Sequence, residues 1–128
     1  MAKNILIIDD EGLVTKSLQK MLAKEGYTAV VAACGKDAIA EYKKSEFDLI
    51  VCDVRMPGMD GIETIEEIRR LRDGLERKNI PEVLITGYAD EEKYKNALKL
   101  KVADYLFKPF DRSQFLDIIK KNLHADKE

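Results

Sequence analysis

Four of the five short apolar runs in this sequence are followed at once by residues that can do chemistry. These residues are Asp9, Asp10 and Glu11 after the first run, Asp53 after the third, Thr86 after the fourth and Lys108 after the fifth. In an open parallel sheet, ligands bind outside the carboxyl ends of the strands, so we expect these side chains to gather at one edge. A single aspartate or lysine in such a position is most often a solvated loop residue. The complete set indicates a site.

Three aspartates brought together repel one another, so such a cluster either keeps a proton at a raised pKa or binds a cation. Oxygen ligands without a nearby histidine or thiolate favour Mg²⁺ or Mn²⁺. A carboxylate is also a nucleophile that can form an acyl phosphate, and a cation lowers the barrier to that step. We therefore expect phosphoryl chemistry at Asp53, with Lys108 as a second positive charge. Thr86 is either a hydrogen-bond donor to a phosphoryl oxygen or a strand-end cap.

The elements that must position these residues are strands and helices in alternation. The apolar runs are nearly continuous, which is typical of strands buried on both faces; they are Ile5–Ile8, Ala29–Ala33, Leu49–Cys52, Val83–Ile85 and Tyr105–Phe107. Segments with a helical period separate or follow them, near 14–22, 38–42, 62–71, 94–98 and 115–123. The order predicts an α/β fold of five βα units around a doubly wound parallel five-stranded sheet. We expect Gly26 to cap the first helix and the turn cluster 56–61 to precede the third.

The composition is that of one globular domain, which we expect to span 1–128. The 128 residues carry a formal net charge of −2 and are 45% hydrophobic. Basic and acidic residues are mixed along the chain, which argues against direct nucleic-acid binding, because that requires a basic face. No apolar run reaches the ~18 residues of a membrane span, and the first residues lack the apolar region of a signal peptide, so we expect a cytoplasmic protein. Cys34 and Cys52 are expected to be reduced core thiols.

From Lys3 to about Leu123 the sequence resembles the receiver domain of two-component response regulators, in particular the chemotaxis-regulator-like single receivers. The matching segments, in order, are Ile5–Glu11, Asp53–Gly61, Ile85–Tyr88 and Asp104–Phe110. No single segment is decisive, but together and in this order they are highly specific. The resemblance implies the flavodoxin-like strand order 2-1-3-4-5.

The resemblance also implies a role for each residue of the set. Asp53 would be both the phosphorylated residue and a Mg²⁺ ligand, and Asp10 would be a direct ligand. The backbone carbonyl of Arg55 would be the third protein ligand, and Asp9 would help to hold the cation, partly through water. Mn²⁺ is possible in place of Mg²⁺. Two further residues, Thr86 and Lys108, would contact the phosphoryl group, and the Lys108–Pro109 bond would be cis.

A switch and a set of partners follow from the same resemblance. Thr86 would move toward the phosphoryl group and Tyr105 would turn inward, which remodels the face made by the fourth helix, fifth strand and fifth helix. The implied partners are a sensor histidine kinase or histidine phosphotransfer protein and a downstream protein, without direct nucleic-acid or membrane binding. The chain would be a monomer or a phosphorylation-promoted dimer. It would catalyse only its own phosphorylation and dephosphorylation.

Some residues depart from the family pattern or occupy variable positions in it. Lys101-Val102-Ala103 replaces the glycine that many relatives have after the fourth helix, and the stretch 69–79 is long and charged, so the ends of the third and fourth helices are in question. Arg55 and Tyr88 lie in variable positions beside the acidic residues, and we hypothesise that they tune hydrolysis of the acyl phosphate. We assign no role to His124.

Two alternatives stay open. The first is the receiver portion of a longer transcription factor or hybrid kinase, although Met1 and the charged tail favour an N-terminal or complete protein. The second, remote alternative is an aspartate-nucleophile phosphatase. Such enzymes usually carry a second aspartate two residues after the nucleophile, where this chain has Arg55, and 128 residues leave no room for a substrate cap domain.

Overall fold

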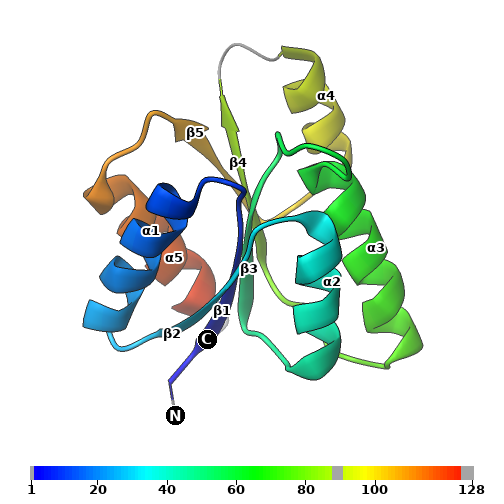
Figure 1. The fold of residues 1–128 in the computed structure, drawn as a ribbon, viewed down its shortest axis with the longest axis horizontal. Coiled ribbons are helices and arrows are strands. Elements are labelled where there is room, and N and C mark those ends of the chain that lie inside the picture. Colours follow the sequence, from blue (N-terminus) through cyan, green and yellow to red (C-terminus); the bar gives the residue numbers. More distant parts are fainter. Residues whose placement is uncertain (1, 88–90, 125–128) are drawn as a thin grey trace.

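The computed structural model describes residues 2–87 and 91–124, which form one parallel sheet flanked by helices (Figure 1). The strands are β1 (Asn4–Ile8), β2 (Thr28–Ala32), β3 (Leu49–Asp53), β4 (Glu82–Gly87) and β5 (Asp104–Lys108). The helices are α1 (Gly12–Lys24), α2 (Gly35–Lys44), α3 (Gly61–Gly74), α4 (Glu91–Lys99) and α5 (Arg112–His124). The strand order is β2-β1-β3-β4-β5. Both the predicted fold class and the strand order are confirmed.

Helices cover both faces of the sheet, with α1 and α5 on one side and α2, α3 and α4 on the other (Figure 1). Side chains along β1 point alternately to the two faces of the sheet and so contribute to the hydrophobic core on each face. Ile5 and Ile7 pack with the α1 and α5 residues, while Leu6 and Ile8 pack with the α2 and α3 residues. This is why the strand sequences are apolar without interruption. None of the helices among residues 2–87 and 91–124 has both the length and the apolar composition that a membrane span requires.

Local signals set the ends of α1 and α3. Gly26 has φ of 87°, and the amides of Gly26 and Tyr27 donate to the carbonyls of Ala23 and Leu22, which is a Schellman end. At the start of α3, the Asp60 carboxylate accepts from the Glu63 amide and the Glu63 side chain accepts from the Asp60 amide. The expected cap at Gly26 and the expected turn before the third helix are therefore confirmed.

The ends of α3 and α4 are made without glycine in the left-handed position. Lys101, after α4, has φ of 53°, and Glu76, after α3, has φ of 54°. Next to Glu76, Arg77 lies 4.8 Å from the Tyr42 ring centroid and donates to the carbonyls of Tyr42, Lys43 and Ser45 at the end of α2. These carbonyls have no partner within a helix, so the guanidinium group stabilises the end of α2. The charged stretch after α3 thus has a structural role.

The two cysteines are free thiols in different surroundings. Cys52 is buried in β3, as expected for a core thiol. Cys34 is only partly buried, and its sulfur accepts the Asp37 amide at 3.5 Å at the start of α2. The prediction of two core thiols is therefore wrong for Cys34, because an apolar segment in the sequence continues past the end of β2 into the helix cap.

Candidate metal centre

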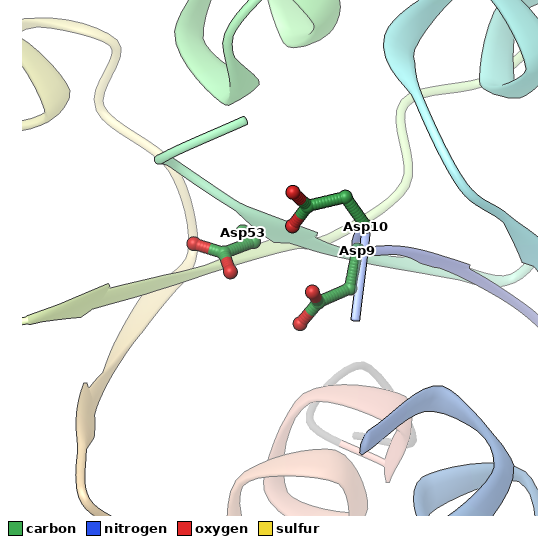
Figure 2. A group of neighbouring side chains, drawn as sticks. All are labelled: Asp9, Asp10 and Asp53. Carbon is green, nitrogen blue, oxygen red and sulfur yellow. The ribbon is translucent and has the colours of Figure 1, made fainter. Parts of the chain in front are cut away.

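Three aspartates meet where β1 and β3 end, and Figure 2 shows their carboxyl groups gathered in one place. The two strands are neighbours, with Ile8 paired to Cys52, so the residues that follow, Asp9 and Asp53, are brought side by side. One ligand atom from each of Asp9, Asp10 and Asp53 lies within 4.8 Å of the others. Asp9 and Asp53 are buried and Asp10 is exposed. The acidic cluster expected from the sequence is present.

The charge of this cluster is not balanced by protein groups alone. Burial and the nearby negative charge of Asp53 raise the pKa of Asp9 from 3.8 to about 6, although the Glu11 amide donates to Asp9 Oδ1 at 3.0 Å and opposes the rise. The other oxygen, Oδ2, is buried and lacks a hydrogen-bond partner within the described residues. A hard divalent cation fits these residues, because it supplies positive charge and a ligand contact to oxygen donors.

Asp53 is held at both of its carboxylate oxygens. Oδ1 accepts the Arg55 amide at 3.1 Å, and Oδ2 accepts the Lys108 ammonium group at 2.8 Å. Burial acts to lower the pKa of Lys108, but the hydrogen bond and negative charge of Asp53 outweigh it, and the pKa is raised. Lys108 also lies 3.5 Å from the Glu11 carboxylate. Lys108 is therefore shared between two carboxylates at the mouth of the cluster.

The remaining residues of the predicted set lie on β4 and β5. Thr86 is buried near the end of β4, one position after Ile85, which pairs with Asp53. Tyr105 on β5 is half-buried and donates its hydroxyl hydrogen bond to the Ala97 carbonyl of α4 at 3.1 Å. The Lys108–Pro109 bond is cis, which confirms that expectation. The side chain of Arg55 is exposed, and the ligand role of its carbonyl stays a prediction. Tyr88 lies outside the described residues.

Two contacts at the site were not predicted from the sequence. One is the contact of Lys108 with Glu11. Glu11 is among the polar residues after the first apolar run, but its contact with Lys108 was not predicted. The other is the close approach of Gly61 to the backbone of Asp53: a Cβ added at Gly61 would lie 2.2 Å from the Asp53 carbonyl oxygen. The Gly61 amide donates to the Val54 carbonyl at 2.9 Å, so α3 begins directly against the backbone of the central aspartate. A glycine inside a turn cluster was the available signal.

A hollow of about 690 Å³ lies beside the metal centre, between α1 and the segment after β5. Glu11 and Lys108 form the end of the hollow that is shared with the site. Most of its wall is apolar and includes Leu13, a residue that is 87% exposed, together with Met21 and Phe110. The charged centre therefore continues into an open apolar groove along α1.

Comparisons with known proteins agree on one family. The family model described as the response regulator receiver domain matches residues 5–120. The transcriptional regulatory protein ZraR of Salmonella typhimurium is 37% identical over 125 residues, which cover 98% of this chain and 27% of that protein. The chain thus spans about a quarter of the length of this curated relative.

Two solved structures illustrate the likeness in fold. A response regulator receiver domain protein (CheY-like) from Methanospirillum hungatei is 30% identical, with a TM-score of 0.87, over 99% of this chain and 98% of that chain. The chemotaxis protein CheY4 of Vibrio cholerae is 27% identical, with a TM-score of 0.83, over 95% of this chain and 99% of that chain. Both likenesses extend over nearly the whole of each structure.

Proposed function

The chain belongs to the response regulator receiver domain family of two-component signalling proteins, and from this premise we propose that Asp53 accepts a phosphoryl group from a phosphohistidine donor. The observation that carries the proposal is the pair of hydrogen bonds at Asp53, from the Arg55 amide and the Lys108 ammonium group, beside two further aspartates. These contacts orient a buried carboxylate next to groups that can balance the charge of a phosphoryl group.

The transfer forms a bond between an Asp53 carboxylate oxygen and phosphorus as the bond between phosphorus and the donor imidazole nitrogen breaks. The electron pair leaves with the imidazole. Lys108 then exchanges its contact with the carboxylate for one with a phosphoryl oxygen, while the Arg55 amide continues to orient the aspartate. Preorganised donors of this kind stabilise charge that develops on the transferred group.

Asp10, Asp53 and the Arg55 carbonyl are the proposed direct protein ligands of a resident Mg²⁺, with Asp9 as a ligand partly through water and Mn²⁺ as a substitute. A bound divalent cation would neutralise the attacking carboxylate and the phosphoryl oxygens. The fit rests on the raised pKa of Asp9 and on its buried Oδ2, which no protein donor contacts within the described residues.

The output of this chemistry is a change at the face of α4, β5 and α5. Thr86 lies on β4, next to the strand that carries Asp53, and we propose that it donates its hydroxyl hydrogen bond to the phosphoryl group. Tyr105 ties β5 to α4 through its bond to Ala97. Release of that bond would free α4 and alter the surface that a downstream protein binds. ZraR is a transcriptional regulator, so a linked output domain is the proposed context of this chain.

The groove along α1 is the proposed binding site for the protein that donates the phosphoryl group. The occupant is the histidine-bearing helix of a histidine kinase or a histidine phosphotransfer protein. Its apolar face would cover Leu13 and Met21 while its phosphohistidine meets Lys108 and Asp53. The support is continuity, because Glu11 and Lys108 belong both to the groove wall and to the site.

Intact-mass measurement with acetyl phosphate tests the phosphoacceptor assignment. The parent protein in Mg²⁺ is expected to gain one phosphate-sized increment, which an excess of chelator abolishes. Asp53→Asn removes the nucleophilic oxygen but keeps the size of the side chain, so this variant should show no gain.

The control is Asp48→Asn, which changes an acidic residue at the opposite edge of the sheet, where Asp48 accepts the Asn4 amide at 2.7 Å. This variant should be labelled like the parent. Labelling of Asp53→Asn to the same extent as the parent, or labelling of the parent that is indifferent to the chelator, would refute the assignment.

A further inference from the structure

A second charged pocket lies at the edge of the sheet opposite the metal centre. Its volume is about 510 Å³, and it is bounded by the second half of α3, the start of β4 and the segment after α4. Its charged wall consists of Arg69, Arg72, Lys101 and Glu82, with Asn79 and Pro81 completing the rim. Glu82 lies three residues before Ile85, which pairs with Asp53, so the pocket is separated from the acidic cluster by roughly 10 Å along the strands, at about 3.3 Å per residue.

Among the described residues that line this pocket, Glu82 is the only carboxylate, and it is already paired. Arg69 Nε donates to both oxygens of Glu82 at 3.2 Å, and Arg69 Nη2 donates to Glu82 Oε1 at 2.5 Å. The Glu82 side chain is 8% exposed, so this pair fixes the position of the guanidinium group against the floor of the pocket. Arg69 Nη1 takes part in none of these bonds. A planar guanidinium group held in this way is suited to bind a second anion.

Arg72 lies three residues further along α3, and therefore on the same side of the helix. Its Nε donates to Asp73 at 3.0 Å, and neither of its Nη atoms is used in that bond. The Arg72 side chain is only 22% exposed, so its guanidinium group is held close to the protein surface. Two guanidinium groups thus line the pocket from one helix.

Lys101 brings a third cation from the other side. It is held in the left-handed region, with φ of 53°, at the turn that ends α4. A lysine there costs stability relative to glycine, but it places a positive side chain on the pocket wall. Two of these three cations are paired with carboxylates, Arg69 with Glu82 and Arg72 with Asp73, so one positive charge is left in excess in a concave site.

We propose that this pocket binds a small molecule with at least two anionic groups, phosphate or carboxylate, bridging the guanidinium groups of α3 and Lys101. The volume lies within the roughly 300–1,000 Å³ that small-ligand sites occupy. A bound anion would link the end of α3 to the end of α4, two helices on the same face of the sheet (Figure 1). The site is separate from Asp53, and the proposal does not depend on phosphorylation.

Calorimetric titration with two probes, pyrophosphate and citrate, tests the proposal in a metal-depleted buffer without added chelator at low ionic strength. We expect saturable binding of at least one probe to the parent protein. Arg72→Gln and Lys101→Gln should each weaken it by about tenfold, as expected for loss of one charged contact worth about 1.4 kcal/mol. Binding of pyrophosphate alone assigns the phosphate class, and binding of citrate alone assigns the carboxylate class.

Matched controls separate a site from a diffuse charge effect. Arg70→Gln removes an arginine charge from α3 and Lys99→Gln removes a lysine charge at the end of α4, both at exposed positions outside the pocket, and each should change the affinity by less than about twofold. Asp53→Asn should bind like the parent. Absence of saturable binding, equal weakening by the control variants, or loss of binding in Asp53→Asn would overturn the proposal.

Discussion

Asp9 is the residue at which function and stability oppose each other most directly. It is buried beside Asp53, and its pKa is raised to about 6. A carboxylate with this pKa is ionised at neutral pH at a cost of about 3 kcal/mol relative to the unfolded chain. The same negative charge of Asp9 would attract a divalent cation to the site. It therefore lowers the stability of the metal-free protein and raises the affinity of the site for the metal.

Asp9→Asn should therefore stabilise the metal-free protein. We expect its free energy of unfolding at neutral pH to exceed that of the parent by about 1–2 kcal/mol, less than the full cost because the buried amide also loses hydration. An acid with a raised folded pKa contributes stability that is fully present below 3.8 and is lost as the pH rises through about 6. The advantage of the variant should be small near pH 4 and largest near pH 7.

Urea denaturation in the presence of a chelator, followed by circular dichroism at several pH values, measures this difference. Added Mg²⁺ should reverse the ranking, because it binds and stabilises the parent more than the variant. An advantage that does not change with pH would show that ionisation of the buried Asp9 carboxyl group is not the cause.

At the scale of the elements, the end of α4 holds a residue other than glycine in the left-handed region. Lys101 adopts the left-handed conformation that glycine adopts at Gly26 after α1. For a residue with a Cβ this conformation costs about 1–2 kcal/mol. A glycine avoids this cost, but it also gives the unfolded chain more conformational freedom, which cancels part of the gain in stability.

Lys101→Gly should raise the free energy of unfolding by about 0.5–1 kcal/mol. Lys101→Ala serves as the control for the lost charge, because it keeps the strained Cβ and should bring no such gain. Gly26→Ala should lower stability by about 1 kcal/mol through the backbone alone, since its Cβ would meet nothing within 4 Å. Thermal and urea unfolding of the three variants provide the measurement. A destabilised Lys101→Gly would contradict this account.

At the scale of the whole molecule, two sites of opposite charge lie at opposite ends of the strands. The acidic centre and the groove along α1 lie at the carboxyl ends of the strands, and the pocket of Arg69, Arg72 and Lys101 lies at the amino ends of β4 and β5. A protein donor and a small anion would therefore meet different parts of the surface. Variants at one edge can therefore be used to test the site at that edge without disturbing the site at the other edge.

Leu13→Gln should slow phosphoryl transfer from a protein donor by about tenfold, because Leu13 is 87% exposed in the proposed groove and its burial would contribute about 1.5 kcal/mol or more. Labelling by acetyl phosphate, which needs no docking surface, should be unchanged. The donor is a histidine phosphotransfer protein selected because it phosphorylates the parent chain.

Leu75→Gln is the matched control, since Leu75 is 48% exposed and lies beyond the end of α3. It should transfer like the parent with both donors. A Leu13→Gln variant that is equally slow with acetyl phosphate would place the effect in the metal centre, and one that is unaffected with the protein donor would exclude the groove as the docking surface.

The sequence by itself determined the order and number of the elements and the edge at which the polar residues gather. Both depend on local information, because the hydrophobic period distinguishes strands from helices and the carboxyl ends of parallel strands share one edge. Element ends were less predictable. The polar terminal turns of α1 and α5 extend beyond the apolar stripe, and Cys34 follows an apolar run yet caps α2.

Only the tertiary structure decided which charged groups meet. The contacts of Lys108 with Glu11, of Arg69 with Glu82 and of Gly61 with the Asp53 backbone depend on how separate elements pack. The raised pKa of Asp9 depends on burial by residues from several elements. Residue type and spacing state what chemistry a side chain can do, but its partners and its exposure to water are set by distances in the folded chain, which local sequence patterns do not contain.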